Sequence, residues 1–68
     1  MGAGARYELL HPHELEEILR RAPVAYIPLG SLEWHGRHLP LGNDAIKAYE
    51  ICLRAAERTE GVVFPPLY

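Results

Sequence analysis

Two short apolar runs on either side of a helical pattern restrict the fold of this chain more than any other feature. Residues 24–29 (VAYIPL) show no alternation of polar and apolar side chains, which predicts a strand covered on both faces in a parallel sheet. Asn43 or Asp44 can cap a helix that runs to about Glu60, and residues 62–64 (VVF) predict a second strand. Strand, helix and strand together predict a βαβ unit with a right-handed connection and parallel strands.

A shorter helix is predicted ahead of the first strand. Residues 12–21 (PHELEEILRR) place a proline in the first turn, acidic side chains early and two arginines at the end, and each of these favours a helix. Its apolar side chains, Leu15, Ile18 and Leu19, predict a buried stripe. In the longer helix, Gly61 is the predicted C-terminal stop. The predicted fold class is therefore α/β, a βαβ unit with a preceding helix.

A chain of 68 residues with one cysteine is short for this kind of fold. A domain of this size buries only roughly 60% of the surface that its unfolded chain exposes. Cys52 has no second cysteine in the chain with which to form a disulfide. A parallel sheet also needs helices on both faces and more than two strands. We therefore expect residues 1–68 to be the N-terminal fragment of one larger α/β domain.

Charge and hydropathy argue against several classes of function. The 7 Lys and Arg residues against 9 Asp and Glu residues give a net charge of −2 without a basic run, which argues against binding to nucleic acid. No apolar stretch approaches the roughly 18 residues needed to span a bilayer. Residues 1–8 contain no hydrophobic signal region. We expect a soluble, cytoplasmic protein that has neither a nucleic acid nor a membrane as partner.

The segment between the first strand and the longer helix is the predicted functional loop. Residues 30–44 (GSLEWHGRHLPLGND) contain glycines and a proline that interrupt any helical or strand period. Loops of this length in small domains are usually functional or disordered, and the His, Trp and Leu content argues against disorder. In open α/β sheets, ligands bind beyond the carboxyl ends of the strands, where this loop lies.

Three residues of this loop form a candidate metal-ligand set. Glu33 and His35 are two positions apart, so on an extended stretch their side chains point to the same side, and Asp44 could fold back toward them. Glu, His and Asp together suit Zn²⁺, Mn²⁺ or Fe²⁺, and an Asp carboxylate can bridge two metals. The alternatives are a helix cap for Asp44, a solvated charge for Glu33 and an ordinary loop imidazole for His35.

A longer motif surrounds these three residues. Residues 28–44 (PLGSLEWHGRHLPLGND) closely resemble the signature of the creatininase (creatinine amidohydrolase) family, whose usual form is PxGSxEQHGPHLPLxTD. The match has no gaps, and the resemblance extends through the chain but covers only the first part of the family's domain. It implies a three-layer α/β/α domain, and a metal-dependent amidohydrolase that cleaves a C–N bond in a cyclic or linear amide with two divalent metals.

The resemblance also implies roles for individual residues. By motif position, Glu33 would bind one metal, His35 the other, and Asp44 would bridge both. In the family, a further His and Glu ligand and a catalytic His come from later segments, so no catalytic residue is expected within residues 1–68. A small-molecule amide as substrate and a homo-oligomeric state of the complete protein are further implications.

Three residues depart from the usual signature without removing a ligand. Trp34 replaces a glutamine, Arg37 replaces a proline and Asn43 replaces a threonine. Trp34 could line the substrate pocket or pack under the loop, and Arg37 could contact an anionic substrate group or simply face solvent. His38 lies in the same motif and could orient a ligating carboxylate or serve only the structure of the loop.

Two functional hypotheses follow. In the first, the chain is the N-terminal part of an amidohydrolase with a di-metal-activated water, inactive alone and completed by the rest of the domain or by a complementing chain. In the second, it is a small non-catalytic α/β module that binds metal or a partner. A coding sequence that continues in frame, or a neighbouring frame that encodes the later ligands, would favour the first hypothesis.

Overall fold

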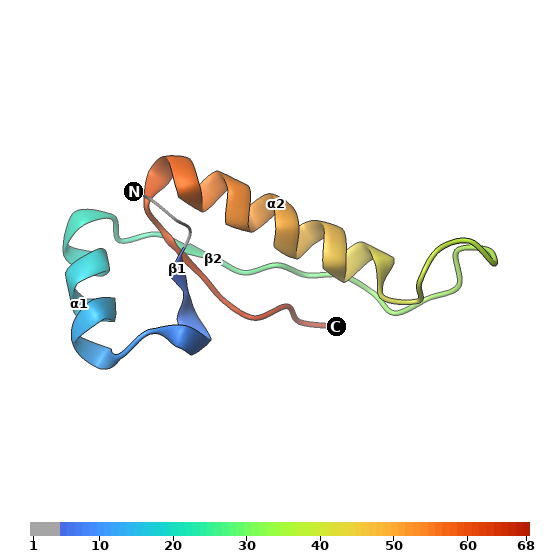
Figure 1. Ribbon diagram of the computed structural model, residues 1–68, viewed down its shortest axis with the longest axis horizontal. Helices are drawn as coiled ribbons and strands as arrows, with labels where there is room; N and C mark the ends of the chain where they lie inside the picture. Colours follow the sequence, from blue (N-terminus) through green and yellow to red (C-terminus); the bar gives the residue numbers. More distant parts are fainter. Residues whose placement is uncertain (1–4) are drawn as a thin grey trace.

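A three-stranded parallel sheet with two α-helices forms the computed structural model, which describes residues 5–68 (Figure 1). The order across the sheet is β1-β3-β2, with β3 in the centre. The predicted α/β fold class is confirmed. In chain order the elements are β1 (Ala5–Arg6), the 3-10 helix η1 (Tyr7–Leu9), α1 (Pro12–Arg21), β2 (Ala25–Tyr26), α2 (Asn43–Thr59) and β3 (Val62–Val63).

Strand β3 lies between two parallel partners. Val62 pairs with Ala5 in β1 and with Ala25 in β2. Pairing continues beyond the regular strands, because Leu29 and Leu67 form a further parallel bridge. The predicted strand–helix–strand unit with parallel strands is therefore confirmed, although its regular strands are shorter than the two apolar runs.

The sequence pattern does not predict β1. Its two residues, Ala5–Arg6, carry no periodicity, and only pairing with β3 makes this segment a strand. Tyr7, the next residue, stacks on Phe64 with the ring centroids 4.5 Å apart and the ring planes inclined by 13°. The segment ahead of α1 is thus held by contacts with residues that lie far away in the sequence.

Helix α1 has the predicted bounds but lacks the predicted buried stripe. Leu15 and Ile18 are half-buried, and Leu19 is 41% exposed. The helix lies at one end of the sheet, where it contacts β3 (Figure 1). This position offers too little neighbouring surface to cover three apolar side chains.

Both ends of helix α2 differ from the prediction. Gly42 is the N-cap, and Asn43 and Asp44 lie inside the helix without a capping side-chain hydrogen bond, because the Asp44 carboxylate faces the preceding loop. At the other end Glu60 adopts the left-handed conformation (φ 70°) that ends the helix. Gly61 is buried after it, and a Cβ at that position would lie 2.8 Å from the ring of residue 26.

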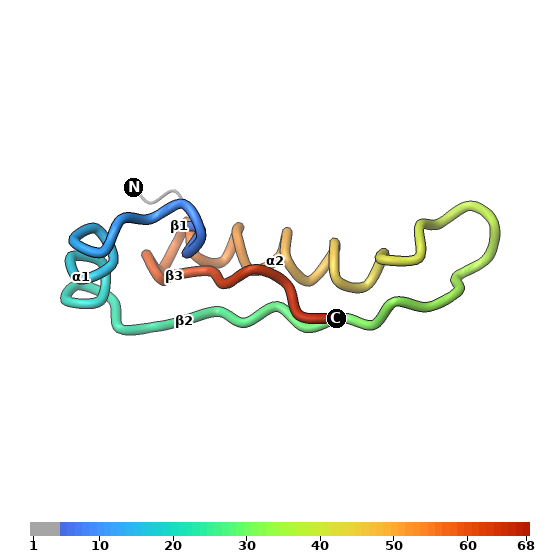
Figure 2. The backbone as a smooth tube through the Cα atoms, turned by 90° about the horizontal axis from the view of Figure 1, so that it is seen from below, coloured from blue at the N-terminus to red at the C-terminus, as the bar shows by residue number. Residues whose placement is uncertain are grey.

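Small side chains make up most of the buried core. Figure 2 shows α2 running along the strands, and this helix contacts β1 and β3. Neither α-helix of the described residues is both long and apolar enough to cross a membrane. The buried apolar residues are Ala22, Pro28, Ala45, Ala56, Val62 and Val63.

The chain around β2 exposes large apolar side chains. Val24 is 43% exposed, Ile27 54% and Leu29 65%. The prediction that this run is covered on both faces is therefore wrong within the described residues. The physical reason is that β2 is an edge strand of the sheet and that α2 supplies a single helical layer along the strands.

The first turn of α1 generates a prediction about pH. The backbone N–H of His11 donates to Oε1 of Glu14 (2.8 Å), and this hydrogen bond lowers the pKa of the Glu14 carboxyl group from its usual value. Its stabilising effect is present above the pKa of unfolded Glu14 and is lost as the pH falls through the lower folded value. We expect an NMR titration to give a lower pKa for Glu14 in the folded chain than in urea.

Glu14→Gln is the control for this titration. Its amide oxygen can still accept the hydrogen bond from His11, but it does not ionise. The variant should therefore keep the helix and lose this part of the pH dependence of stability. Equal Glu14 pKa values in the folded and urea-unfolded chains would contradict the interpretation.

Candidate metal centre

The loop between β2 and α2 projects from the end of the molecule opposite α1 (Figure 1). The molecule measures 43 × 20 × 15 Å along its principal axes, and the loop forms one tip of the long axis. The loop turns back on itself, because the N–H of Glu33 donates to the Leu41 carbonyl (3.0 Å). Gly36, between these two residues, has a φ of 84°, a conformation that favours glycine.

A close backbone contact joins the start of this loop to α2. A Cβ atom at Gly30 would lie 2.7 Å from the carbonyl carbon of Asp44 and closer still to the backbone of Ala45. The N–H of Gly30 also donates to the Leu67 carbonyl (3.1 Å), which attaches the same residue to the extended chain after β3. The absence of a side chain at Gly30 therefore lets the loop begin directly against the first turn of the helix.

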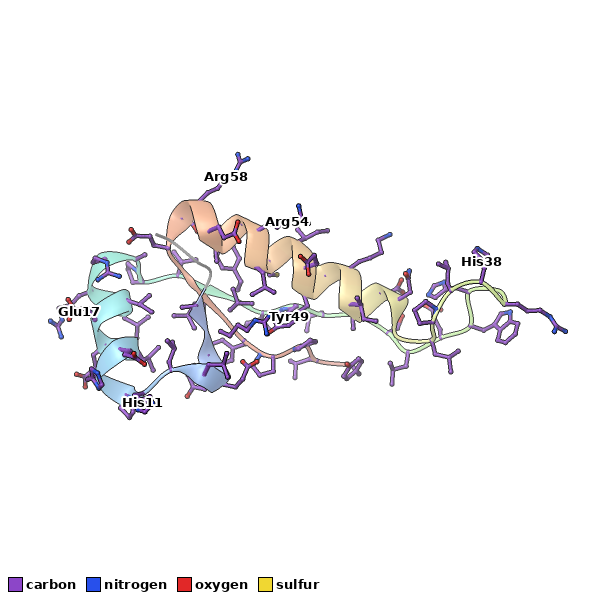
Figure 3. All side chains as sticks on the ribbon, viewed as in Figure 1. His11, Glu17, His38, Tyr49, Arg54 and Arg58 are labelled. Atoms are coloured by element: carbon purple, nitrogen blue, oxygen red, sulfur yellow. The ribbon has the colours of Figure 1, made fainter. Side chains whose placement is uncertain are left out.

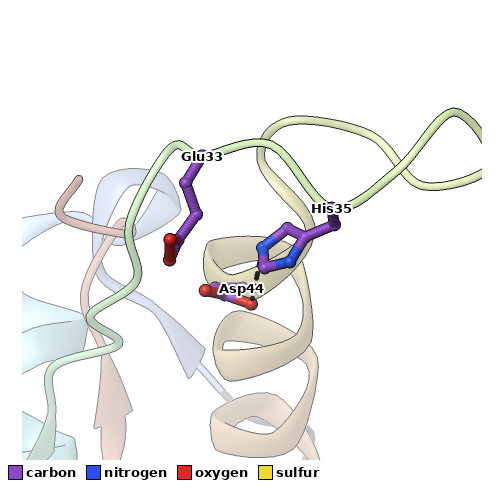
Figure 4. Close-up of side chains that lie close together, drawn as sticks. All are labelled: Glu33, His35 and Asp44. Atoms are coloured by element: carbon purple, nitrogen blue, oxygen red, sulfur yellow. Dashed lines mark ion pairs between the residues drawn. The ribbon is translucent and has the colours of Figure 1, made fainter.

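Glu33, His35 and Asp44 come together at this contact (Figure 4). One ligand atom from each side chain lies within 4.8 Å of the other two. The first two residues are on the outgoing half of the loop, and Asp44 is in the first turn of α2. Glu33 is exposed, whereas His35 and Asp44 are half-buried. The three residues singled out in the sequence are thus neighbours in space.

The environment of the His35 imidazole indicates whether this cluster suits a cation. Its Nε2 atom is 3.3 Å from Oδ1 of Asp44, a distance that suits an ion pair if the ring is protonated. The atom is nevertheless buried and has no hydrogen-bond partner among the described residues. A buried polar nitrogen without a partner is unfavourable, and coordination of a cation by its lone pair would satisfy it. The donor set of two carboxylates and one imidazole fits a divalent metal.

Ser31 also belongs to the cluster, which the sequence pattern did not predict. Its Oγ donates to Oε2 of Glu33 (2.6 Å) and lies 3.1 Å from Oδ2 of Asp44. A signal was present in the sequence: Ser31, Glu33 and His35 are spaced by two, which places all three on one side of an extended stretch.

Three further residues of the motif lie around the cluster without a hydrogen bond or ion pair to it within the described part of the chain. Trp34 is 69% exposed, so its ring does not pack under the loop. Arg37 and His38 are exposed as well, and Figure 3 shows His38 on the outer side of the loop. Their expected roles toward a substrate or a ligating carboxylate stay predictions.

Negative charge accumulates at the cluster. Among residues 5–68, no lysine or arginine forms an ion pair with Glu33 or Asp44, since the arginine ion pairs all lie elsewhere. The N-terminus of α2 supplies partial positive charge beside Asp44. Two carboxylates in such proximity repel each other, so a bound cation would relieve an unfavourable interaction.

Comparison with known proteins gives the following findings. Residues 8–68 match the family model Creatininase, described as creatinine amidohydrolase. A curated relative, the creatinine amidohydrolase of Pseudomonas putida, is 39% identical over 44 residues, which are 65% of this chain and 17% of that protein. The match therefore spans less than a fifth of the relative's length. No solved structure matches the chain significantly.

Replacement of Gly30 by alanine is expected to separate the loop from α2. The added methyl group would collide with the backbone of Asp44 and Ala45, which cannot yield without a shift of the helix. We expect the free energy of unfolding to fall by about 1–3 kcal/mol, the usual range for overpacking. Urea denaturation followed by far-UV circular dichroism measures this change.

Gly42→Ala is the matched control for this substitution. A Cβ atom at Gly42 would meet only Cδ2 of Leu32 at 3.6 Å and Cδ1 of Ile46 at 3.9 Å, which are ordinary contacts. We expect a smaller loss of stability, of the size associated with a weaker N-cap. If Gly30→Ala destabilised the chain no more than Gly42→Ala, the close approach would not have the importance assigned to it.

Proposed function

Because this chain belongs to the creatininase family, we propose that it is the N-terminal part of a metal-dependent amidohydrolase that cleaves a C–N amide bond. The substrate class is a small-molecule amide, cyclic or linear. Family membership supports the hydrolytic chemistry, and the cluster of Glu33, His35 and Asp44 inside the family motif supports the use of metal.

The orientation of Asp44 is the observation on which the proposal chiefly rests. Its Oδ1 lies 3.3 Å from Nε2 of His35, whereas its Oδ2 faces Ser31, whose Oγ contacts Glu33. One oxygen of the Asp44 carboxylate is thus next to His35, and the other is linked to Glu33 through the hydroxyl group of Ser31. This arrangement supports a bridging role for Asp44, with Glu33 on one side and His35 on the other.

The three side chains would hold two divalent cations, of which Zn²⁺, Mn²⁺ and Fe²⁺ suit the donor set. When bound, such a pair supplies a water activated near neutral pH and polarises the amide carbonyl. Glu33 is the exposed member of the set within residues 5–68. Contact between the exposed ring of Trp34 and a small amide substrate is part of the same proposal.

Residues outside this chain would complete the site and the domain. The family resemblance implies a further His and Glu ligand and a catalytic His from later segments, so we expect residues 1–68 to be inactive alone. The exposed apolar side chains of Val24, Ile27 and Leu29 support a covering layer from the rest of the domain or a complementing chain. Homo-oligomerisation and a cytoplasmic location belong to the same proposal.

The isolated 68-residue chain is expected to bind Zn²⁺ or Mn²⁺ more weakly than micromolar and to hydrolyse no amide. Three protein ligands can coordinate a cation, but the exposed Glu33 side chain and the projecting loop must be ordered upon binding. Isothermal titration calorimetry measures the affinity, and an amide hydrolysis assay on the same sample measures turnover. Submicromolar affinity together with measurable turnover would contradict the proposal of an incomplete site.

In the complete protein, Glu33→Gln and Asp44→Asn are each expected to abolish amidase activity. Both changes remove a ligand charge while they preserve side-chain size, so metal content should fall together with turnover. Metal analysis of the purified variants measures this second quantity. Glu50→Gln is the control, because Glu50 is an exposed residue of α2 that pairs with Arg54. Near-normal turnover in either ligand variant would refute its assigned role.

A further inference from the structure

We propose that Ser31 is a positioning residue, whose hydroxyl group holds Glu33 and Asp44 in the arrangement that a divalent cation requires. The inference rests on the proposed metal site and adds to it a residue that does not itself coordinate. Ser31 Oγ lies 2.6 Å from Oε2 of Glu33 and 3.1 Å from Oδ2 of Asp44. Among the described residues, no other side chain forms hydrogen bonds to both carboxylates.

The two contacts of Ser31 are unequal because a hydroxyl group carries one proton. It can donate to only one carboxylate at a time, and the 2.6 Å contact to Glu33 has the length of a strong charge-assisted hydrogen bond. The contact to Asp44 is longer, so that carboxylate shares the donor less strongly. Each carboxylate oxygen accepts more than one interaction. The hydroxyl therefore fixes the carboxylates and leaves lone pairs free for a cation.

The position of Ser31 is itself well determined. The preceding residue, Gly30, is hydrogen-bonded through its N–H to the Leu67 carbonyl and lies against the backbone of Ala45. Ser31 thus leaves the sheet from a fixed point beside α2. Glu33, by contrast, lies in the projecting loop and is exposed. A hydroxyl group on the anchored side of the loop can restrain a carboxylate on its freer side.

Electrostatics explain why Glu33 needs this restraint. Within the described chain no lysine or arginine pairs with Glu33 or Asp44, so before a cation binds the two carboxylates repel each other. Loss of the hydroxyl group would release Glu33 to rotate toward solvent, where its charge is better hydrated. A cation would then have to recover that side chain from many rotamers, which lowers affinity.

The test is the affinity of the chain for Zn²⁺ in variants of Ser31, followed by NMR titration of ¹⁵N-labelled protein. Residues that orient metal ligands typically contribute about 10–100-fold to metal affinity, and we expect Ser31→Ala to weaken Zn²⁺ binding within that range. Ser31→Thr keeps the hydroxyl group and should bind nearly as well as the parent chain. The spectra without metal should stay close to the parent spectrum, because Ser31 is exposed.

A second pair of variants separates the hydroxyl group from the shape of the side chain. Ser31→Val has nearly the shape of Ser31→Thr but lacks the donor, so it should bind as weakly as Ser31→Ala. Thr59→Val is the remote control, because Thr59 forms a hydroxyl contact of the same length (2.6 Å, to Tyr26) near the far end of α2. It should leave Zn²⁺ affinity unchanged.

The outcomes distinguish this inference from the proposed function. If the parent chain binds Zn²⁺, Glu33→Gln weakens binding and Ser31→Ala does not, the role of Ser31 is wrong and the metal site stands. Equal affinities of Ser31→Thr and Ser31→Val would likewise overturn it, even if Ser31→Ala is too unstable to measure. A parent chain that binds no Zn²⁺ under any condition would contradict both the weak metal binding expected of residues 1–68 and the role of Ser31.

Discussion

The contact between Gly30 and the first turn of α2 is the constraint on which the candidate site depends. It brings the end of an extended segment so near the helix that a Cβ atom would collide with the backbone of Ala45. Because of this proximity, loop residues and a helix residue can share one cluster, although Glu33 and Asp44 belong to different elements. A methyl group at Gly30 would force these two backbones apart and so shift the loop residues relative to Asp44.

Close packing of α2 against the rest of the chain also explains why small residues make up much of the core. Ala45 and Ala56 are fully buried between α2 and the sheet, and only small residues allow that approach. Small side chains bury little apolar area, so this interface contributes less to stability than one built from leucines. Larger apolar side chains, among them Ile27 and Leu29, remain exposed around the edge strand. The geometry that brings the ligands together therefore leaves much of the chain's hydrophobic surface uncovered.

Local sequence signals predicted the helices and the strand–helix–strand order. Long-range contacts determine strand β1 and the direction of the Asp44 side chain. The bounds of α1 follow from a proline at its start and arginines at its end, both of which act locally. Strand β1 escaped prediction because only hydrogen bonds to β3 define it. Asp44 has the local features of a helix cap, but a loop contact 13 positions away in sequence takes its carboxylate instead. Spacing by two predicted that Glu33 and His35 share a side, yet it could not predict how the hydroxyl of Ser31 is used.

The bridge between Leu29 and Leu67 has a consequence for folding. Leu67 donates its N–H to the Pro28 carbonyl (2.9 Å) and accepts the N–H of Gly30 through its carbonyl (3.1 Å). The starting point of the loop is therefore held by a segment that follows β3, and it becomes fixed only when the whole strand–helix–strand unit has closed. A ligand that binds only the closed form shifts the equilibrium toward closure by mass action. Ligand binding at the loop and formation of the bridge between Leu29 and Leu67 are thus one coupled equilibrium. A change in one of them is measurable as a change in the other.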